Sequence, residues 1–168
     1  RKNLSEKIDL NLFFLMLNVH WEVSETSPTK KEIEKELDAI AKKLFSSPFF
    51  VGQKRADISV IFCDSQKIRA LNRDYRAKNA STDVLSFAER DFDQKNKFLE
   101  ESDSLGEIFI NYDWLREGKD HGLKGLQELF THGALHLAGF DHEKDNGEMR
   151  KMEKKLKIFL LASFKKSL

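Results

Sequence analysis

Apolar residues follow two different spacings along this chain, and each spacing predicts its own kind of element. Short runs rich in β-branched and aromatic residues predict strands, and these runs lie at residues 12–21, 57–63, 84–87 and 105–111. Apolar residues three and four positions apart predict helices, because that spacing gathers them on one face. Helices are therefore expected from residue 29 to the Ser-Ser-Pro at 46–48, after residue 64, and over about 125–138 and 143–164.

Each of these helices has end signals or an apolar face. Thr29 and Glu32 form a capping-box pattern at the start of the first helix, and Asp64 with Ser65 caps the second. Gly139 ends the helix over 125–138. The apolar faces consist of Ile33, Leu37, Ile40, Ala41 and Leu44 in the first helix, Ile68, Leu71 and Tyr75 in the second, and Met149, Met152, Leu156, Phe159, Leu160 and Ser163 in the last.

Strands and helices that alternate without a visible repeat or linker predict an α+β fold, in which helices pack against a small mixed sheet of about four strands. The length of 168 residues suits one domain over residues 1–168. The polar stretch 91–104 is expected to be an exposed loop. The apolar run 10–17 lacks a small-residue cleavage site after it, so we interpret it as a buried strand rather than a signal peptide.

Composition and charge exclude several classes of protein. Hydrophobic residues make up 40% of the chain and charged residues 34%, which excludes a disordered chain and a membrane protein. The formal net charge of +1 does not by itself indicate a nucleic-acid binder, so any basic surface must come from uneven placement of charges. The single cysteine, Cys63, excludes an intramolecular disulfide framework and suits a reducing compartment. We therefore expect a cytoplasmic protein without a membrane partner.

Three histidines within eleven residues predict a metal site. His132 and His136 lie one helical turn apart on the same face, and Gly139 can adopt a positive φ that turns the chain and brings His142 back. Three imidazoles and one water make the tetrahedral set of a catalytic zinc ion, whereas a structural zinc has four protein ligands. Imidazole also suits copper, nickel and iron. Cys63 is a possible fourth ligand, although it is distant in sequence.

The histidine spacing is that of metzincin peptidases, which carry a glutamate general base directly after the first histidine. Gly133 occupies that position here. Loss of one acid–base residue typically costs a factor of ~10²–10⁴ in rate. A metzincin-like peptidase therefore remains only a minor alternative. Metal-assisted cleavage of a phosphodiester is better supported, because a metal ion alone lowers the pKa of its bound water.

The segment 71–87 leaves an arginine-rich helix, crosses a polar turn and enters a strand. Arginine grips phosphate with a planar fork and stays charged. If this turn faces the metal, Arg76 holds a phosphate and stabilises the charge that develops on it. The alternative from composition alone is a solvated helix face with ion pairs to Asp74 and Asp83.

Both segments resemble the YbeY family of rRNA maturation factors of bacteria and organelles. The resemblance runs through Asn72, Tyr75, Arg76 and the Thr-Asp-Val-Leu-Ser-Phe at 82–87, continues in the Leu-Gly-Glu-Ile at 105–108, and ends in the histidines of 132–142 with Glu148, Met152 and Glu153. Ser81, Ala88 and Glu107 stand where the family pattern has proline, proline and aspartate, and none of these three is a metal ligand.

The resemblance implies a zincin-like α+β fold and a single-strand-specific endoribonuclease that acts in maturation of the small-subunit (16S) rRNA 3′ end and in ribosome quality control. One Zn²⁺ would be held by His132, His136, His142 and a water. Arg76 and His132 are expected to be catalytic, and Arg73, Arg76 and Lys78 to bind RNA. The residues expected to brace the cleft or support the ligands are Thr82, Asp83, Ser86 and Asp141, with Glu143 beside them.

The attacking group, water or the RNA 2′-hydroxyl, is left open by the sequence. Expected partners are ribosomal RNA, the small ribosomal subunit and assembly factors, and the protein is expected to be a monomer. A non-catalytic assembly factor with a structural zinc ion is the main alternative. An open coordination position on the metal would favour catalysis, whereas a fourth protein ligand would favour the structural role.

Overall fold

The structure is a computed structural model that describes residues 14–23, 29–50, 55–89, 104–117 and 122–165. Its described strands form one sheet in the order β1-β2-β4-β3. These strands are β1 (Phe14–Trp21), β2 (Arg55–Cys63), β3 (Val84–Ala88) and β4 (Ser104–Asn111). The β1–β2 and β2–β4 pairs are parallel, and β3 runs antiparallel to β4. The predicted small mixed sheet is therefore confirmed.

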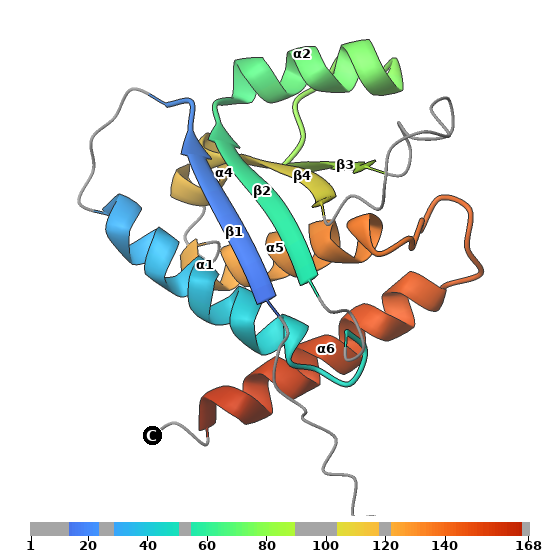
Figure 1. Cartoon of the computed structure of the whole chain (residues 1–168). Coiled ribbons are helices and arrows are strands. Elements are labelled where there is room, and N and C mark those ends of the chain that lie inside the picture. The colour runs from blue at the N-terminus through green and yellow to red at the C-terminus, as the bar shows by residue number, and fades with distance from the viewer. Residues whose placement is uncertain (1–13, 24–28, 51–54, 90–103, 118–121, 166–168) are drawn as a thin grey trace, which may run out of the picture.

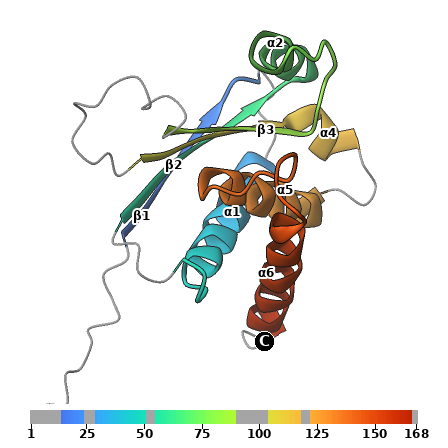
Figure 2. The same cartoon turned by 90° about the vertical axis from the view of Figure 1, so that its right-hand side faces the viewer.

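Helices lie on both faces of this sheet. The described helices are α1 (Thr29–Phe45), α2 (Ser65–Arg76), α4 (Tyr112–Glu117), α5 (Gly122–Leu137) and α6 (Glu148–Lys165). Figure 1 shows α2 above one face of the sheet and α1, α5 and α6 on the other side. The view in Figure 2, turned by 90°, shows the same layers edge-on. No helix within the described ranges is both long and apolar enough to cross a bilayer.

The main core lies between the sheet and the α1, α5 and α6 layer. The predicted face of α1 is confirmed, because Leu37, Ile40, Ala41 and Leu44 are fully buried. From the strands, Ile58, Val60, Phe62, Ile108 and Ile110 enter the same core, and α5 and α6 add Phe130, Leu135, Met149, Leu156 and Leu160. A smaller core of Cys63, Ile68 and Leu85 lies on the α2 side.

Both edge strands are less buried than the sequence suggests. In β1, Leu15, Leu17 and Val19 pack against the core, while Met16 is 37% exposed on the other side. The prediction of a strand is correct for residues 14–21, but that of a buried strand is wrong, because the side chains of residues 15–21 are alternately half-buried and exposed; residues 10–13 lie outside the described ranges. In β3 only Leu85 and Ala88 are buried, because this strand forms the opposite edge of the sheet.

Local hydrogen bonds explain where two elements differ from prediction. The last helix begins at Glu148 instead of 143, because the Asp145 carboxylate accepts hydrogen bonds from the backbone N–H groups of Gly147 and Met149. The short helix α4 was not anticipated. Its first turn is supported by the Asn111 side-chain oxygen, which accepts a hydrogen bond from the Trp114 N–H. The predicted cap of Thr29 and the loop at 91–103 fall outside what the structure describes.

Candidate metal centre and its cleft

The end of α5 places the three histidines together. His132 and His136 lie on the last turns of α5, and Gly139 has a φ of 107°, a left-handed conformation that favours glycine. The Gly139 N–H donates to the His136 carbonyl and the Phe140 N–H donates to the Leu135 carbonyl. This pair of bonds is the Schellman arrangement that ends a helix and reverses the chain. His142 is thereby returned to the face that carries the other two rings.

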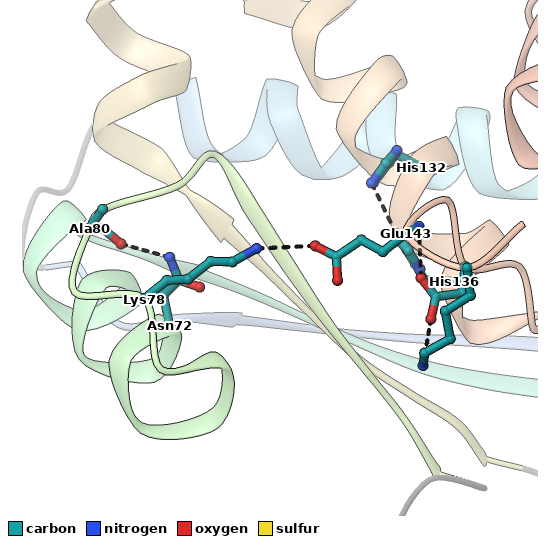
Figure 3. A network of polar contacts seen from close by, with 8 residues as sticks. Asn72, Lys78, Ala80, His132, His136 and Glu143 are labelled. Atoms are coloured by element: carbon teal, nitrogen blue, oxygen red, sulfur yellow. Dashed lines mark hydrogen bonds and ion pairs between the residues drawn. The ribbon is translucent and has the colours of Figure 1, made fainter. Parts of the chain in front are cut away.

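The ligand atoms of His132, His136 and His142 lie within 4.8 Å of one another. The Nε2 atoms of His132 and His136 are 3.1 Å apart. Two nitrogens on a tetrahedral zinc ion, each at about 2.0–2.1 Å, are separated by about 3.3–3.4 Å. The three imidazoles therefore fit a metal ion, and a dashed line in Figure 3 marks the contact between the Nε2 atoms of His132 and His136.

Cys63 does not join this group. It is fully buried in the smaller core, and burial raises the pKa of its thiol to about 12. Within the described ranges, no further histidine, cysteine, aspartate or glutamate belongs to the candidate metal group. The ligand set is therefore one of three imidazoles, as the sequence predicts.

Glu153 on α6 fixes the orientation of His132. Its carboxylate oxygen lies 2.7 Å from His132 Nδ1. With the carboxylate ionised, Nδ1 carries the proton and donates, which leaves the Nε2 lone pair directed at the other rings. Sequence reasoning assigned Glu153 no role, because 21 residues separate it from its partner and only the packing of α6 on α5 brings them together.

His136 is prepared for metal binding in a different way. Burial, and after it the charges of His132, His142 and Arg76, together lower its pKa to about 4, against a hydrogen bond with the Phe140 backbone that raises it. A neutral imidazole is the form that binds a metal ion. His136 is therefore ready to act as a ligand throughout the physiological pH range.

We expect the Glu153→Gln variant to bind zinc about 10- to 100-fold more weakly than the wild type, because the amide no longer polarises the His132 ring. Competition with a chromophoric chelator measures the affinity. Glu128→Gln is the matched control, since Glu128 also lines the cleft but pairs with Lys157 rather than with a histidine. Equal zinc affinities for the two variants would remove Glu153 from the metal site.

The histidines open into a cleft of about 760 Å³, which we call the histidine cleft. Its walls come from α5, α6, β3 and the turn after α2. Arg76, Lys78, Thr82, Asp83 and Ser86 all line it, so the structure brings these predicted residues beside the histidines. The α6 wall adds Arg150, Lys154 and Lys157.

Two predicted residues lie elsewhere. Arg73 does not line the histidine cleft, and its guanidinium pairs with the neighbouring Asp74 carboxylate at 2.7 Å. Asp141 does not line it either. Its carboxylate accepts hydrogen bonds from the Glu143 N–H and Lys144, which hold the pKa of Asp141 below its usual value. The assignment of Arg73 to RNA and of Asp141 to the ligands is thus not supported by their positions.

Two buried asparagines hold the turn that carries Arg76 and Lys78. The Asn72 side-chain N–H donates to the Ala80 carbonyl at 2.8 Å, as Figure 3 shows. The Asn111 side-chain N–H groups reach the Thr82 carbonyl and the Ser81 hydroxyl. Ala77 adopts φ 56° at the end of α2. The turn is therefore anchored to α2 and to the end of β4. Sequence reasoning assigned Asn72 no structural role, and Asn111 was missed because its partners lie in distant segments.

An ion pair joins this turn to the loop that carries His142. Lys78 Nζ lies 3.1 Å from Glu143 Oε1, and Figure 3 shows the two side chains reaching toward each other. The bond to Lys78 is the main cause of the lowered pKa of Glu143. Arg76 also lowers the pKa values of Glu143 and His136, which places its guanidinium within electrostatic reach of the metal centre.

Gly133 faces the sheet at a point of close approach. A Cβ atom at this position would lie 2.8 Å from Ile108 Cγ2 and 3.0 Å from Ser86 Oγ. Real contacts of a Cβ atom are longer, so a side chain here requires the buried Ile108 side chain or α5 itself to shift. The position that holds the general base in metzincins therefore has no room for a glutamate here.

Comparison with known proteins identifies relatives of this chain. Residues 20–163 match the family model described as Endoribonuclease YbeY. A protein of that name from Campylobacter jejuni strain 81-176 is 42% identical over 111 residues, which cover 64% of this chain and 76% of that protein. One from Sulfurovum sp. NBC37-1 is 43% identical, over 60% of this chain and 69% of its own length. The solution structure of TM1509 from Thermotoga maritima shares 27% identity and a TM-score of 0.49, covering 90% of this chain and 93% of that one.

Proposed function

The chain belongs to the YbeY family, and on that premise we propose that it is a zinc-dependent endoribonuclease that cuts single-stranded RNA. The observation that carries this proposal is the open cluster of His132, His136 and His142 in a cleft that Arg76 also lines. The relatives from Campylobacter jejuni and Sulfurovum bear the name of an endoribonuclease, which supports the same reaction.

The donor set supports zinc as the metal. Three neutral imidazoles at tetrahedral spacing suit it, with no protein group of the described residues in the fourth position. When bound, zinc supplies Lewis acidity and lowers the pKa of a coordinated water. Within the chain, Glu153 keeps the His132 ring in its ligating tautomer. Arg76 holds the phosphate with two parallel N–H bonds and stabilises the charge that grows on it in the transition state.

The attacking group is water or the RNA 2′-hydroxyl, and product ends distinguish the two. A 2′,3′-cyclic phosphate would exclude attack by water. The natural substrate in this proposal is the 3′ end of small-subunit rRNA, with the small ribosomal subunit and assembly factors as partners and ribosome quality control as the setting. A cytoplasmic location is part of the same proposal, and the free thiol of Cys63, which suits a reducing compartment, supports it. The monomeric state is carried over from the sequence as an expectation.

The two alternatives are less well supported. A metzincin-like peptidase lacks its general base, and Gly133 lies too close to Ile108 for one to be added. A purely structural zinc ion would be expected to have a fourth protein ligand. The described residues place only three imidazoles at the centre and leave them open to a large cleft, which favours catalysis.

The experiment that tests the proposal incubates zinc-loaded protein with short single-stranded RNA and with ribosomes, with and without chelator, and maps the ends produced. Chelator-sensitive cleavage of single strands is the expected result. Casein or a peptide library serves as the competing substrate. Cleavage of peptides but not RNA, or RNA cleavage that persists in chelator, would overturn the proposal.

We expect Arg76→Ala to retain one zinc per chain but to lose about 10²- to 10³-fold in cleavage rate, the usual cost of removing one donor to transition-state charge. Rates on the single-stranded RNA and zinc content by atomic absorption check this. Arg73→Ala is the matched control on the same helix, because Arg73 is paired with Asp74 and lies outside the histidine cleft. Unchanged cleavage by Arg76→Ala would remove Arg76 from the mechanism.

A further inference from the structure

Tyr75 near the end of α2 is exposed in a way that packing does not explain. The sequence groups it with the buried face of α2, but 62% of its surface is exposed. Its ring contacts Phe87 on β3 edge to face, with 5.0 Å between centroids, and Phe87 in turn contacts Phe109 at 5.7 Å. The ring is therefore held at one side by Phe87, which Phe109 supports from behind, while most of it remains open to solvent.

The open part of the ring lines a second cavity, of about 830 Å³, which we call the second hollow. Arg76, Lys78, Ser86, His136 and Glu143 line both this hollow and the histidine cleft. The two spaces are thus contiguous across the candidate phosphate site. Within the described ranges the other exposed large apolar residues, Met16, Ile158 and Leu161, line neither cavity.

Charge in the second hollow is largely paired within the protein. Lys78 pairs with Glu143, and Lys144 pairs with Asp141, both at about 3 Å. The Asp145 carboxylate accepts hydrogen bonds from the start of α6. Arg76 is the cation of this hollow for which the described residues provide no ion pair. The hollow therefore suits a neutral, flat group next to one phosphate better than a second phosphate.

From this arrangement we infer that Tyr75 stacks on a nucleobase adjacent to the phosphate that Arg76 holds, so that the second hollow is a nucleobase subsite for single-stranded RNA. Tyr75 and Arg76 both line the hollow, so a ring that can stack on a base lies beside a guanidinium that can bind the phosphate of the same or the next nucleotide. Stacking on an aromatic ring tolerates every base, so the subsite selects unpaired nucleotides more than sequence. The inference rests on the proposed function and adds the residue that recognises the strand.

The test measures stacking directly. The probe is a short single-stranded oligoribonucleotide with one 2-aminopurine, whose fluorescence is quenched when the base stacks. Its dissociation constant is measured with wild type, Tyr75→Ala, Tyr75→Leu and Tyr75→Phe. We expect about 5- to 150-fold weaker binding and loss of the quenching in the alanine and leucine variants, and values within about twofold of wild type for the phenylalanine variant. Ile158→Ala is the matched control, because Ile158 is equally exposed on α6 and lines neither cavity.

The outcomes separate this inference from the proposed function. Quenching that is lost in Tyr75→Ala, in a protein that never cleaves RNA, would support the subsite and refute the endoribonuclease. Chelator-sensitive cleavage by wild type together with unchanged binding and quenching in Tyr75→Ala and Tyr75→Leu would overturn the subsite and leave the endoribonuclease intact. Absence of binding by wild type would also overturn the subsite. Thermal unfolding of each variant verifies that the fold is retained.

Discussion

Replacing His136 with alanine is expected to leave a protein that is purified without stoichiometric zinc and cleaves RNA no faster than chelator-treated wild type. Two imidazoles would remain, and the lost ring is the one that lies 3.1 Å from His132 and is kept neutral by burial. Zinc content by atomic absorption and cleavage of single-stranded RNA measure the effect. Full zinc occupancy in this variant would contradict the ligand assignment.

The same variant is expected to lose more stability when zinc is present than when it is chelated. Binding of a ligand to the folded state stabilises it by about 2.7 kcal/mol at a hundredfold excess over the dissociation constant, and this contribution vanishes with the site. Melting temperatures measured with zinc and with chelator separate the loss of stabilisation by bound zinc from the loss of packing around the removed ring. His20→Ala is the matched control, because His20 lies exposed on β1, outside the metal group. The same loss of melting temperature in the His20 variant would show that the effect does not come from the metal site.

Replacing Gly133 with glutamate is expected to destabilise the fold severely and to create no peptidase. The Cβ atom would overlap Ile108, and overpacking of a core costs typically about 1–3 kcal/mol before the carboxylate is considered. A buried carboxylate without a partner adds several kcal/mol more. Urea unfolding measures the loss of stability, and a chromogenic peptide tests for the peptidase.

The free energy of unfolding of Gly133→Ala is expected to lie between those of wild type and the glutamate variant. This substitution adds only the Cβ atom, and alanine favours a helix by about 1 kcal/mol over glycine. Gln127→Glu is the control for charge, since it places a carboxylate on the same helix at a half-buried position without added volume. A stably folded Gly133→Glu protein with peptidase activity would refute the account of this position.

The parts of the site that the sequence predicted are those set by local chain geometry. His132, His136, Gly139 and His142 follow from helical spacing and one glycine turn, and the structure confirms their convergence. The face of α1 is also local, because its apolar positions repeat every three or four residues. Such patterns need no knowledge of which element packs against which.

The parts that were missed depend on contacts between distant segments. Glu153 and Asn111 reach partners 21 and 29 to 46 residues away, so no spacing along the chain reveals them. The exposed faces of β1 and β3 follow from the order of strands in the sheet, which places both at its edges. Tyr75 fits the apolar face of α2 by position, but it lies close to the end of that helix, where its ring reaches the edge strand instead of the core.

The bridge between Lys78 and Glu143 has a consequence for how firmly two walls of the histidine cleft are joined. Both side chains are more than half exposed, and exposed ion pairs of this kind contribute little to stability. The link between the turn after α2 and the loop that carries His142 is therefore weak, and added salt screens it further.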